Sequence, residues 1–489
     1  MQKNKPLLIA LVPVVFLIAM LSINVLLVFE DDALAGSNQF ILLLSGGVAA
    51  LLGILNGTPW NMIMGGIEKN IKSTTGALLI LLLIGALAGA WMLSGIVPAM
   101  IYYGLQILHP QYFLPATALI CALISLATGS SWSTTATVGI ALIGIGRAMG
   151  LNEALVAGSV ISGAYFGDKI SPLSDTTNLA PAMAGTDLIT HIRYLLITTV
   201  PSFSIALLLF LIIGLTGGAG GQMDDIQPIL SELNSRFNLT PWLFAVPLLV
   251  IGLIVKRVPA LPAILIGTLA GGAFALLFQQ ELIAQLSAGQ QWQDYYRLVM
   301  NAFTVSVNYQ AQHPVLAELL SSGGMSGMLG TIWLIITAMV FGGAMEAAGF
   351  LETISNALLK LARGTASLIA TTAGTCLVAN VTASDQYLAI VVPGRMYADA
   401  YRKRGLAPEN LSRTLEDSGT VTSVLIPWNT CGAYQSKILG VDVLAYLPYA
   451  FFNYISPFMT LLVAATGYKI RKLHLPKGGQ ANETNATND

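Results

Sequence analysis

The chain has 489 residues, of which 55% are hydrophobic and only 10% are charged, and its formal net charge is −1. A soluble globular protein carries roughly 25% charged residues, so this composition excludes a water-soluble domain. The balanced charge gives no reason to expect nucleic acid as a partner, and the three cysteines have neither disulfide nor metal-ligand spacing. We therefore expect a membrane protein with no cofactor and no resident metal.

Apolar runs long enough to cross a lipid bilayer recur along the chain. A membrane-spanning helix needs about 20 mostly apolar residues. Such runs lie at 6–28, 39–56, 74–97, 194–216, 258–279, 328–350 and 447–467. The predicted fold class is an all-α polytopic membrane protein.

Basic residues predict how the spans are oriented. Cytoplasmic loops carry most Lys and Arg residues, so Lys3 and Lys5 place the N-terminus in the cytoplasm. The later basic loops fall on the same side only if residues 113–148 form a re-entrant hairpin, which enters and leaves the membrane on one face. This scheme predicts about ten transmembrane helices, two re-entrant hairpins and two cytoplasmic termini.

A weak internal repeat divides the chain into two halves. Gly89 and Gly95 recur 254 positions later, and Pro172 matches Pro427 at a distance of 255. Repeats of opposite orientation are frequent in secondary transporters, so we predict two inverted repeats. The first predicted repeat covers 1–216 and contains a hairpin at 113–148 and a broken helix at 150–181. An external loop at 217–241 leads to the second predicted repeat at 242–467, which contains an external insertion at 280–326, a hairpin at 367–394 and a broken helix at 409–440. A cytoplasmic tail is predicted at 468–489.

Polar residues gather at the predicted hairpin tips and helix breaks. Carboxylates and unpaired backbone groups are costly inside a membrane unless they line a cavity. Pro172 and Pro427 should interrupt their helices and free backbone carbonyls for an ion. The candidate ion-binding residues are Ser130, Ser131, Thr134, Asp168, Ser171, Ser174, Asp175, Thr176 and Asn178 in the first half, and Asn380, Thr382, Ser384, Asp385, Asn429 and Thr430 in the second.

This oxygen-rich set suits a small hard cation such as Na+. Burial disfavours the charged form of a carboxylate, so one buried acid near neutral pH can hold either a proton or a sodium ion. Alternate exposure of that acid to the two sides of the membrane would make an antiporter. Our hypothesis assigns the main exchange to Asp175, with Asp168 tuning it.

Several acidic residues have a second interpretation. Asp168 could form a structural ion pair with the adjacent Lys169. Glu416 and Asp417 belong either to a proton path or to a solvated or salt-bridged helix end, and Glu346 belongs to that path or neutralises a basic residue. The sequence does not decide between these alternatives.

The four histidines are predicted to lie at membrane interfaces or outside the bilayer. They are His109, His191, His313 and His474. For His191, we favour an ordinary solvated side chain over a pH-sensing role.

A long motif links this sequence to a known family. The run Ile161-Ser-Gly-Ala-Tyr-Phe-Gly-Asp-Lys-Ile-Ser-Pro-Leu-Ser-Asp-Thr-Thr-Asn-Leu-Ala-Pro181 resembles the signature of the NhaC family of Na+/H+ antiporters, as do Leu415-Glu-Asp-Ser-Gly-Thr420 and Ile426-Pro-Trp-Asn-Thr430. The resemblance implies a secondary transporter of the bacterial cytoplasmic membrane that exchanges Na+ for H+ in pH homeostasis. It places the predicted ion site at Asp168, Ser171, Ser174, Asp175, Thr176 and Asn178.

Other functions compete with this prediction. The second candidate is a Na+- or H+-coupled exchanger of a small organic acid or amino acid, like members of the family that carry malate and lactate. Such an exchanger needs a positively charged side chain near the middle of the membrane, and Lys169 is the candidate. An intramembrane aspartyl protease would have no use for inverted halves, so we expect no enzyme. The sequence leaves open whether two copies form a homodimer.

Overall fold

The computed structural model describes residues 6–28, 36–217, 226–287, 289, 291–306 and 320–473. Within these ranges the chain is helical and has no β-strand, and an isolated antiparallel bridge joins Leu406 and Lys472. This confirms the predicted all-α class. The predictions for Lys3 and Lys5, for His313 and for the tail from His474 onward lie outside the described residues.

Seven helices of the described chain are long and apolar enough to cross a membrane. They are α2 (Ser37–Leu55), α4 (Thr75–Leu93), α6 (Pro110–Thr128), α11 (Leu188–Leu215), α14 (Ala260–Phe278), α18 (Leu329–Ala347) and α20 (Thr365–Thr382). Two bent helix pairs, at 227–255 and 443–466, raise the number to nine if each pair is one span. The polytopic membrane class therefore holds, while the count of ten spans stays a prediction.

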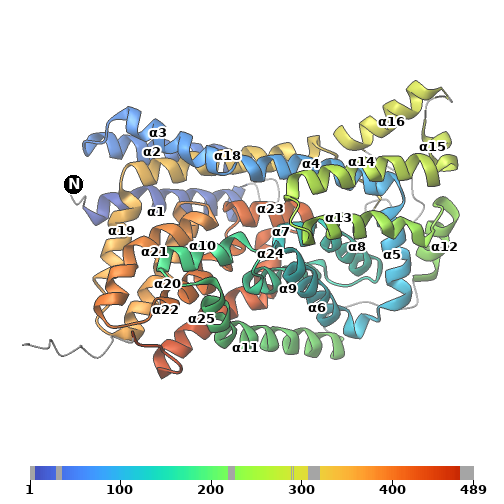
Figure 1. Cartoon of the computed structure of the whole chain (residues 1–489). Coiled ribbons are helices and arrows are strands. Elements are labelled where there is room, and N and C mark those ends of the chain that lie inside the picture. Colours follow the sequence, from blue (N-terminus) through green and yellow to red (C-terminus); the bar gives the residue numbers. More distant parts are fainter. Residues whose placement is uncertain are drawn as a thin grey trace, which may run out of the picture.

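Long helices form a layer along one side of the molecule (Figure 1). In it, α18 contacts α2 and α3 (Trp60–Ser73), and α4 contacts α14 and α16 (Trp292–Thr304). Helices α5 (Ile96–Ile107) and α19 (Phe350–Leu359) stand at opposite ends of these helices (Figure 1). The layer is completed by α1 (Leu7–Ile23), α12 (Ile226–Arg236), α13 (Ala245–Val255) and α15 (Gln280–Leu286).

Glycines bring two of these helix pairs into backbone contact. A Cβ added to Gly343 on α18 would lie 2.6 Å from the Cα of Ile67 on α3. A Cβ added to Gly89 on α4 would overlap the carbonyl oxygen of Ala302 on α16. Small residues allow such close packing where lipid provides little hydrophobic drive between helices. Residues of the predicted external insertion thus pack against a membrane-length helix.

The remaining helices form a second body that carries the polar residues. Its members are α6, α7 (Ser131–Thr134), α8 (Ile140–Ala148), α9 (Glu153–Ile170), α10 (Asp175–Ala184) and α11, followed by α20, α21 (Gln386–Lys403), α22 (Pro408–Leu415), α23 (Thr430–Leu439), α24 (Val443–Tyr446) and α25 (Phe451–Thr466). Helix α6 packs along α9, and α11 packs along α25. Hydrogen bonds between the hydroxyls of Thr375 and Tyr397, and between those of Thr372 and Tyr401, join α20 and α21 as an antiparallel pair.

Local chemistry ends the helices where the sequence predicts breaks. Helix α9 ends at Ile170, two residues before Pro172, and α10 begins after Ser174, whose hydroxyl accepts a hydrogen bond from the Thr177 amide. Helix α22 continues as a π-helical turn (Glu416–Thr420) and a 3-10 turn (Ser423–Leu425), and α23 begins after Asn429, which caps it. Each break leaves four backbone donors or acceptors at a helix end to be satisfied by other groups.

Candidate functional site

Asp168 lies in the last turn of α9 and faces the turn between α6 and α7. Its carboxylate oxygen Oδ2 accepts hydrogen bonds from the Ser131 amide (3.1 Å) and the Ser131 hydroxyl (2.7 Å). The residue is 7% exposed. The Thr177 hydroxyl donates to the carbonyls of Asp168 and Lys169, at 3.1 and 3.0 Å, and so satisfies the end of α9. A buried carboxylate is therefore held at a helix break by oxygen and nitrogen donors.

The other predicted residues of this break mainly hold its backbone. Ser171 donates to the Leu126 carbonyl of α6 at 2.8 Å. Asn178 donates to the carbonyls of Pro172 (3.0 Å) and Ser174 (2.7 Å), and the Ser174 and Thr176 hydroxyls lie 3.2 Å apart. Asp175, at the first position of α10, is exposed, as is Asn178, whereas Ser171, Ser174 and Thr176 are buried.

The predicted hairpin tip at 130–135 is also built by its own hydroxyls. Ser130 caps α7 by accepting a hydrogen bond from the Ser133 amide at 3.1 Å. The Thr134 hydroxyl donates to the Ser130 carbonyl at 2.9 Å. Gly129, which ends α6, has a left-handed backbone (φ 71°) that favours glycine. These contacts fix Ser131 where it meets Asp168.

The second half places a carboxylate at the corresponding turn. Asp385 is 4% exposed and caps α21 by accepting hydrogen bonds from the Tyr387 and Leu388 amides, at 2.9 and 3.1 Å. The Ser384 carbonyl accepts a hydrogen bond from the Thr430 amide at 3.0 Å. The tip of this turn is therefore tied to the start of α23.

Amide side chains join the same turn to the second break. Asn429 donates to the backbone carbonyl (3.1 Å) and side-chain oxygen (3.2 Å) of Asn380. Asn380 in turn donates to the Gly419 carbonyl at 2.7 Å. Thr382 donates only within its own helix, to the Val378 carbonyl. This second break is closed by neutral groups.

The start of α10 and the start of α21 lie side by side. Helix α10, which begins at Asp175, packs against α21, which begins after Asp385. Asp175, Asp385 and Asp168 are within electrostatic range of the Tyr387 hydroxyl, and Asp175 is within electrostatic range of Asp168. The structure thus brings the first helix break and the second hairpin turn to one place. Sequence reasoning missed Tyr387, although its position two residues after Asp385 was a usable signal.

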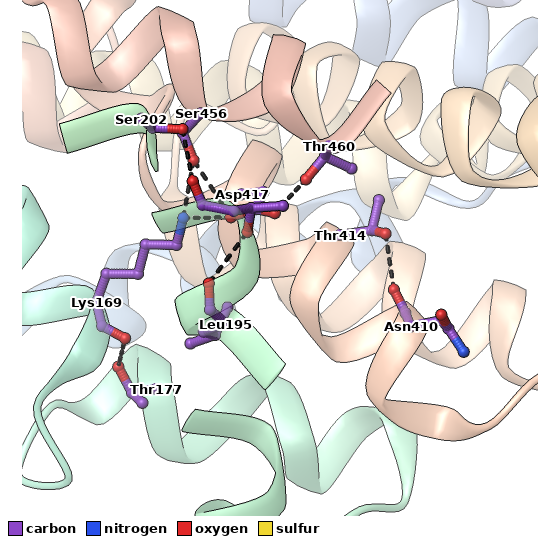
Figure 2. Close-up of polar contacts among 10 residues, drawn as sticks. Lys169, Thr177, Leu195, Ser202, Asn410, Thr414, Asp417, Ser456 and Thr460 are labelled. Carbon is purple, nitrogen blue, oxygen red and sulfur yellow. Dashed lines mark hydrogen bonds and ion pairs between the residues drawn. The ribbon is translucent and has the colours of Figure 1, made fainter. Parts of the chain in front are cut away.

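A buried ion pair lies beside this cluster (Figure 2). Lys169 on α9 pairs with Asp417 on the π-helical turn, and neither side chain is exposed. Lys169 also donates to the Ser456 hydroxyl of α25 at 2.8 Å, and Ser456 and Thr460 donate to Asp417. Lys169 therefore pairs with Asp417 and not with its neighbour Asp168. For Asp417, the structure supports a salt-bridged residue, but in the interior and not at a solvated helix end.

The other acidic candidates have distinct surroundings. Glu416 is fully buried, and neither of its carboxylate oxygens has a hydrogen-bond partner among the described residues. Glu346 pairs with Lys69 at 2.7 Å and accepts a hydrogen bond from Asn70 at 3.1 Å. Of the two interpretations of Glu346, neutralisation of a basic residue is the one that these contacts favour.

The prediction of a solvated His191 is wrong. His191 lies in the first turn of α11, is 0% exposed, and its Nδ1 is 2.8 Å from the Ser412 hydroxyl of α22. The sequence placed His191 at the membrane interface because it lies near the start of a helix. In the structure, α22 packs against α11 and covers the side chain. Among the described residues no group of three or more His, Cys, Asp or Glu side chains is arranged to hold a metal ion.

Long apolar helices, interrupted helices and buried charges together define an integral membrane protein of the transporter class. The chain belongs to the Na+/H+ antiporter family, whose model matches residues 163–468. This confirms the family that the motif at 161–181 predicted.

Characterised relatives cover nearly the whole chain. The chain is 40% identical to the Na(+)/H(+) antiporter NhaC of Alkalihalophilus pseudofirmus, over 87% of this chain and 89% of that protein. It is 35% identical to the malate-2H(+)/Na(+)-lactate antiporter of Bacillus subtilis, over 88% and 89%. It is 34% identical to the arginine/ornithine antiporter ArcD of Halobacterium salinarum, over 94% and 92%.

Proposed function

We propose that this protein exchanges Na+ for H+ across the bacterial cytoplasmic membrane by alternating access, with the cation bound at Asp168. The observation that carries the proposal is the buried carboxylate of Asp168, which Ser131 holds at a broken helix whose second part, α10, packs against the hairpin helix α21 of the other half. Relatives named as Na+/H+ antiporters support the same exchange.

Burial suggests how the two aspartates of the first break divide the work. A carboxylate removed from water favours neutralisation by a proton or a bound cation, and Asp168 is buried while Asp175 is exposed. Burial favours Asp168 as the exchanging group, with Asp175 attracting cations at the entrance, which reverses the roles that the sequence suggested. Ser131, whose hydroxyl donates to Asp168, would contribute an oxygen to this site, and we include Asp385 because its helix packs against α10.

We also propose that the two halves are inverted repeats. Adding 254 to the bounds of α4 (75–93) yields those of α18 (329–347), and adding 255 to α10 (175–184) yields α23 (430–439). Helices α5 and α19 stand at opposite ends of the long helices (Figure 1), which favours an axis in the membrane plane. Left-handed residues recur at the same spacing: Gly95 with Gly349, Gly129 with Ser384, Gly150 with Gly405, and Gly185 with Gly440.

The repeat proposal changes the interpretation of the insertion at 280–326. Helix α16 meets α4 at Gly89 as α3 meets α18 at Gly343, and these two glycines are 254 positions apart. We infer that α16 corresponds to α3 and belongs to the membrane unit. The re-entrant character of both hairpins and the cytoplasmic termini remain parts of the proposal.

An organic-anion exchanger is the second candidate. Lys169, its predicted cation, is engaged by Asp417. Arg413 is an alternative, because its guanidinium is fully buried against the Tyr194 ring and its nitrogens have no hydrogen-bond partner among the described residues. Relatives named as malate–lactate and arginine–ornithine antiporters make this candidate worth testing.

Transport by inside-out vesicles separates the candidates. Addition of Na+ alone should dissipate a preformed pH gradient with the wild-type protein, and Asp168→Asn should abolish this response. Asp399→Asn, at a side chain that is 77% exposed, serves as the matched control. A strict requirement for malate, lactate or arginine would refute Na+/H+ exchange, and a fully active Asp168→Asn protein would refute the assigned site.

A further inference from the structure

Helix α22 and the π-helical turn after it are polar and yet buried. All twelve residues from Glu409 to Thr420 are buried, and nine of them are polar or charged; the exceptions are Leu411, Leu415 and Gly419. Polar groups inside a membrane protein are expensive to bury and mark ion or proton routes. The proposed cation site accounts for the polar residues at the Thr420 end of this segment, but not for those that extend back to Glu409.

The start of this polar segment opens to a cavity. Ala407, Glu409, Arg471, Lys472 and Leu473 line a cavity of about 450 Å³. The Glu409 carboxylate pairs with Arg471 at 3.2 Å and is 9% exposed, so it lies at the boundary between the cavity and the interior. The basic residues around it belong to loops that the proposed topology places in the cytoplasm.

His191 connects the cavity end of the segment with its buried acids. Ser412, one turn after Glu409, donates to the Glu409 carbonyl at 3.3 Å, and its hydroxyl is 2.8 Å from His191 Nδ1. The other ring nitrogen, Nε2, has no partner among the described residues. The charged groups that act on the ring are Asp417 of the π-helical turn and Lys169 of α9.

Glu416 lies four residues after Ser412, so the two side chains share one face of the helix. Its buried carboxylate interacts electrostatically with Lys169, Asp168 and Asp417; Thr420 is its nearest hydroxyl, but the geometry does not make a hydrogen bond among the described residues. A buried carboxyl group without a partner is stable mainly when it carries a proton. Lys169 and Asp417 bind each other, so Glu416 is the acid left to receive a proton in this region.

We propose that His191 relays protons between the cavity at Glu409 and Glu416, along a route separate from the exposed Asp175 side of the cation site. The ring accepts a proton at one nitrogen and releases one from the other, and the exchange of tautomers returns it to its neutral starting form. One proton enters and one leaves, so no net charge stays on the imidazole. This inference rests on the proposed Na+/H+ exchange and names the path of its proton.

Two assays on purified protein in liposomes test the relay. Na+/H+ exchange is followed with a pH-sensitive dye, and exchange of ²²Na+ for Na+, which moves no proton, is followed by isotope uptake. His191→Gln should slow Na+/H+ exchange by at least about tenfold, since general acid–base groups typically contribute about 10² to 10⁴ in rate. The isotope exchange should stay within about twofold of wild type.

Control variants make the outcome decisive. His109→Gln changes an exposed histidine away from α22 and should affect neither assay. If His191→Gln does not reach the membrane folded, Ser412→Ala replaces it and should cause the same split to a smaller extent. Equal loss in both assays, or no loss in either, overturns the relay. A wild-type protein that moves ²²Na+ but no protons would instead overturn the proposed exchange itself.

Discussion

The two helix breaks share a backbone plan but differ in chemistry. Asp168 meets Ser131 at the first break, and 255 positions later Ser423 meets Gln386, with its hydroxyl 3.4 Å from the amide oxygen. Ser174 caps α10 as Asn429 caps α23. The first break therefore has the charged Asp168 where the second has the neutral Ser423. In the proposed mechanism, a broken helix provides the frame of the ion site, and the position of the acid sets where exchange takes place.

The second half carries its charges elsewhere. Asp385 stands at the hairpin turn where the first half has Ser130, Glu409 lies in the first turn of α22, and Glu416 and Asp417 follow that helix. Charges from the second half thus surround the first break without duplicating it. A single exchanging acid, approached by groups from both halves, fits alternating access better than two independent sites.

The largest expected effect on Na+/H+ exchange is the difference between Asp168→Asn and Ser423→Ala, which change corresponding positions of the two breaks. Loss of the carboxylate should reduce Na+/H+ exchange by at least about a hundredfold, or roughly 2.8 kcal/mol, because the neutral amide cannot alternate between H+ and Na+. Loss of the Ser423 hydroxyl should change the rate by less than about threefold, or roughly 0.7 kcal/mol. Vesicle transport at matched protein levels measures both, and similar losses would erase the proposed difference between the breaks.

The next effect concerns the ion pair between Lys169 and Asp417. Asp417→Asn leaves a buried ammonium without its counter-ion, and such a change costs about 3–5 kcal/mol of stability. The double substitution Lys169→Met with Asp417→Leu should regain most of that loss, because both charges are removed. Thermal unfolding in detergent measures this, with Asp399→Asn as an exposed control that should unfold like wild type. A double variant no more stable than Asp417→Asn would contradict the pair's role.

A smaller effect separates charge from capping at the two hairpin turns. Asp385→Asn keeps a good helix cap but removes a charge from the turn that the proposal includes in the cation site, so the KM for Na+ should rise by about tenfold, or roughly 1.4 kcal/mol. Ser130→Ala removes a cap and should cost about 1 kcal/mol of stability. Kinetics and thermal unfolding of both variants test this. An unchanged KM in Asp385→Asn would remove that residue from the site.

The smallest effect is expected at Glu346. Its partner Lys69 is 69% exposed, and exposed ion pairs contribute about 0–1 kcal/mol. Glu346→Gln should therefore leave the exchange rate within about twofold of wild type. A loss of exchange rate as large as that of Asp168→Asn would contradict this prediction and would assign Glu346 to the proton path.

Features that depend on residues close together in the chain could be predicted from the sequence. The apolar runs require helices in lipid because every backbone group must be satisfied internally. Pro172 and Pro427 interrupt helices through their own ring geometry, and the motif at 161–181 identified the family. The acidic candidates followed from the cost of burying charge, which needs no knowledge of partners.

Only the tertiary structure decided which distant groups meet and which side chains are buried. Lys169 pairs with Asp417, 248 positions away, and not with adjacent Asp168. His191 is covered by α22, whereas Asp175 is exposed. Helix periodicity shows which residues share a face, but the partner of that face is set by the packing of the whole bundle. The class of protein could therefore be predicted from short stretches of sequence, whereas the arrangement of the charged side chains required the tertiary structure.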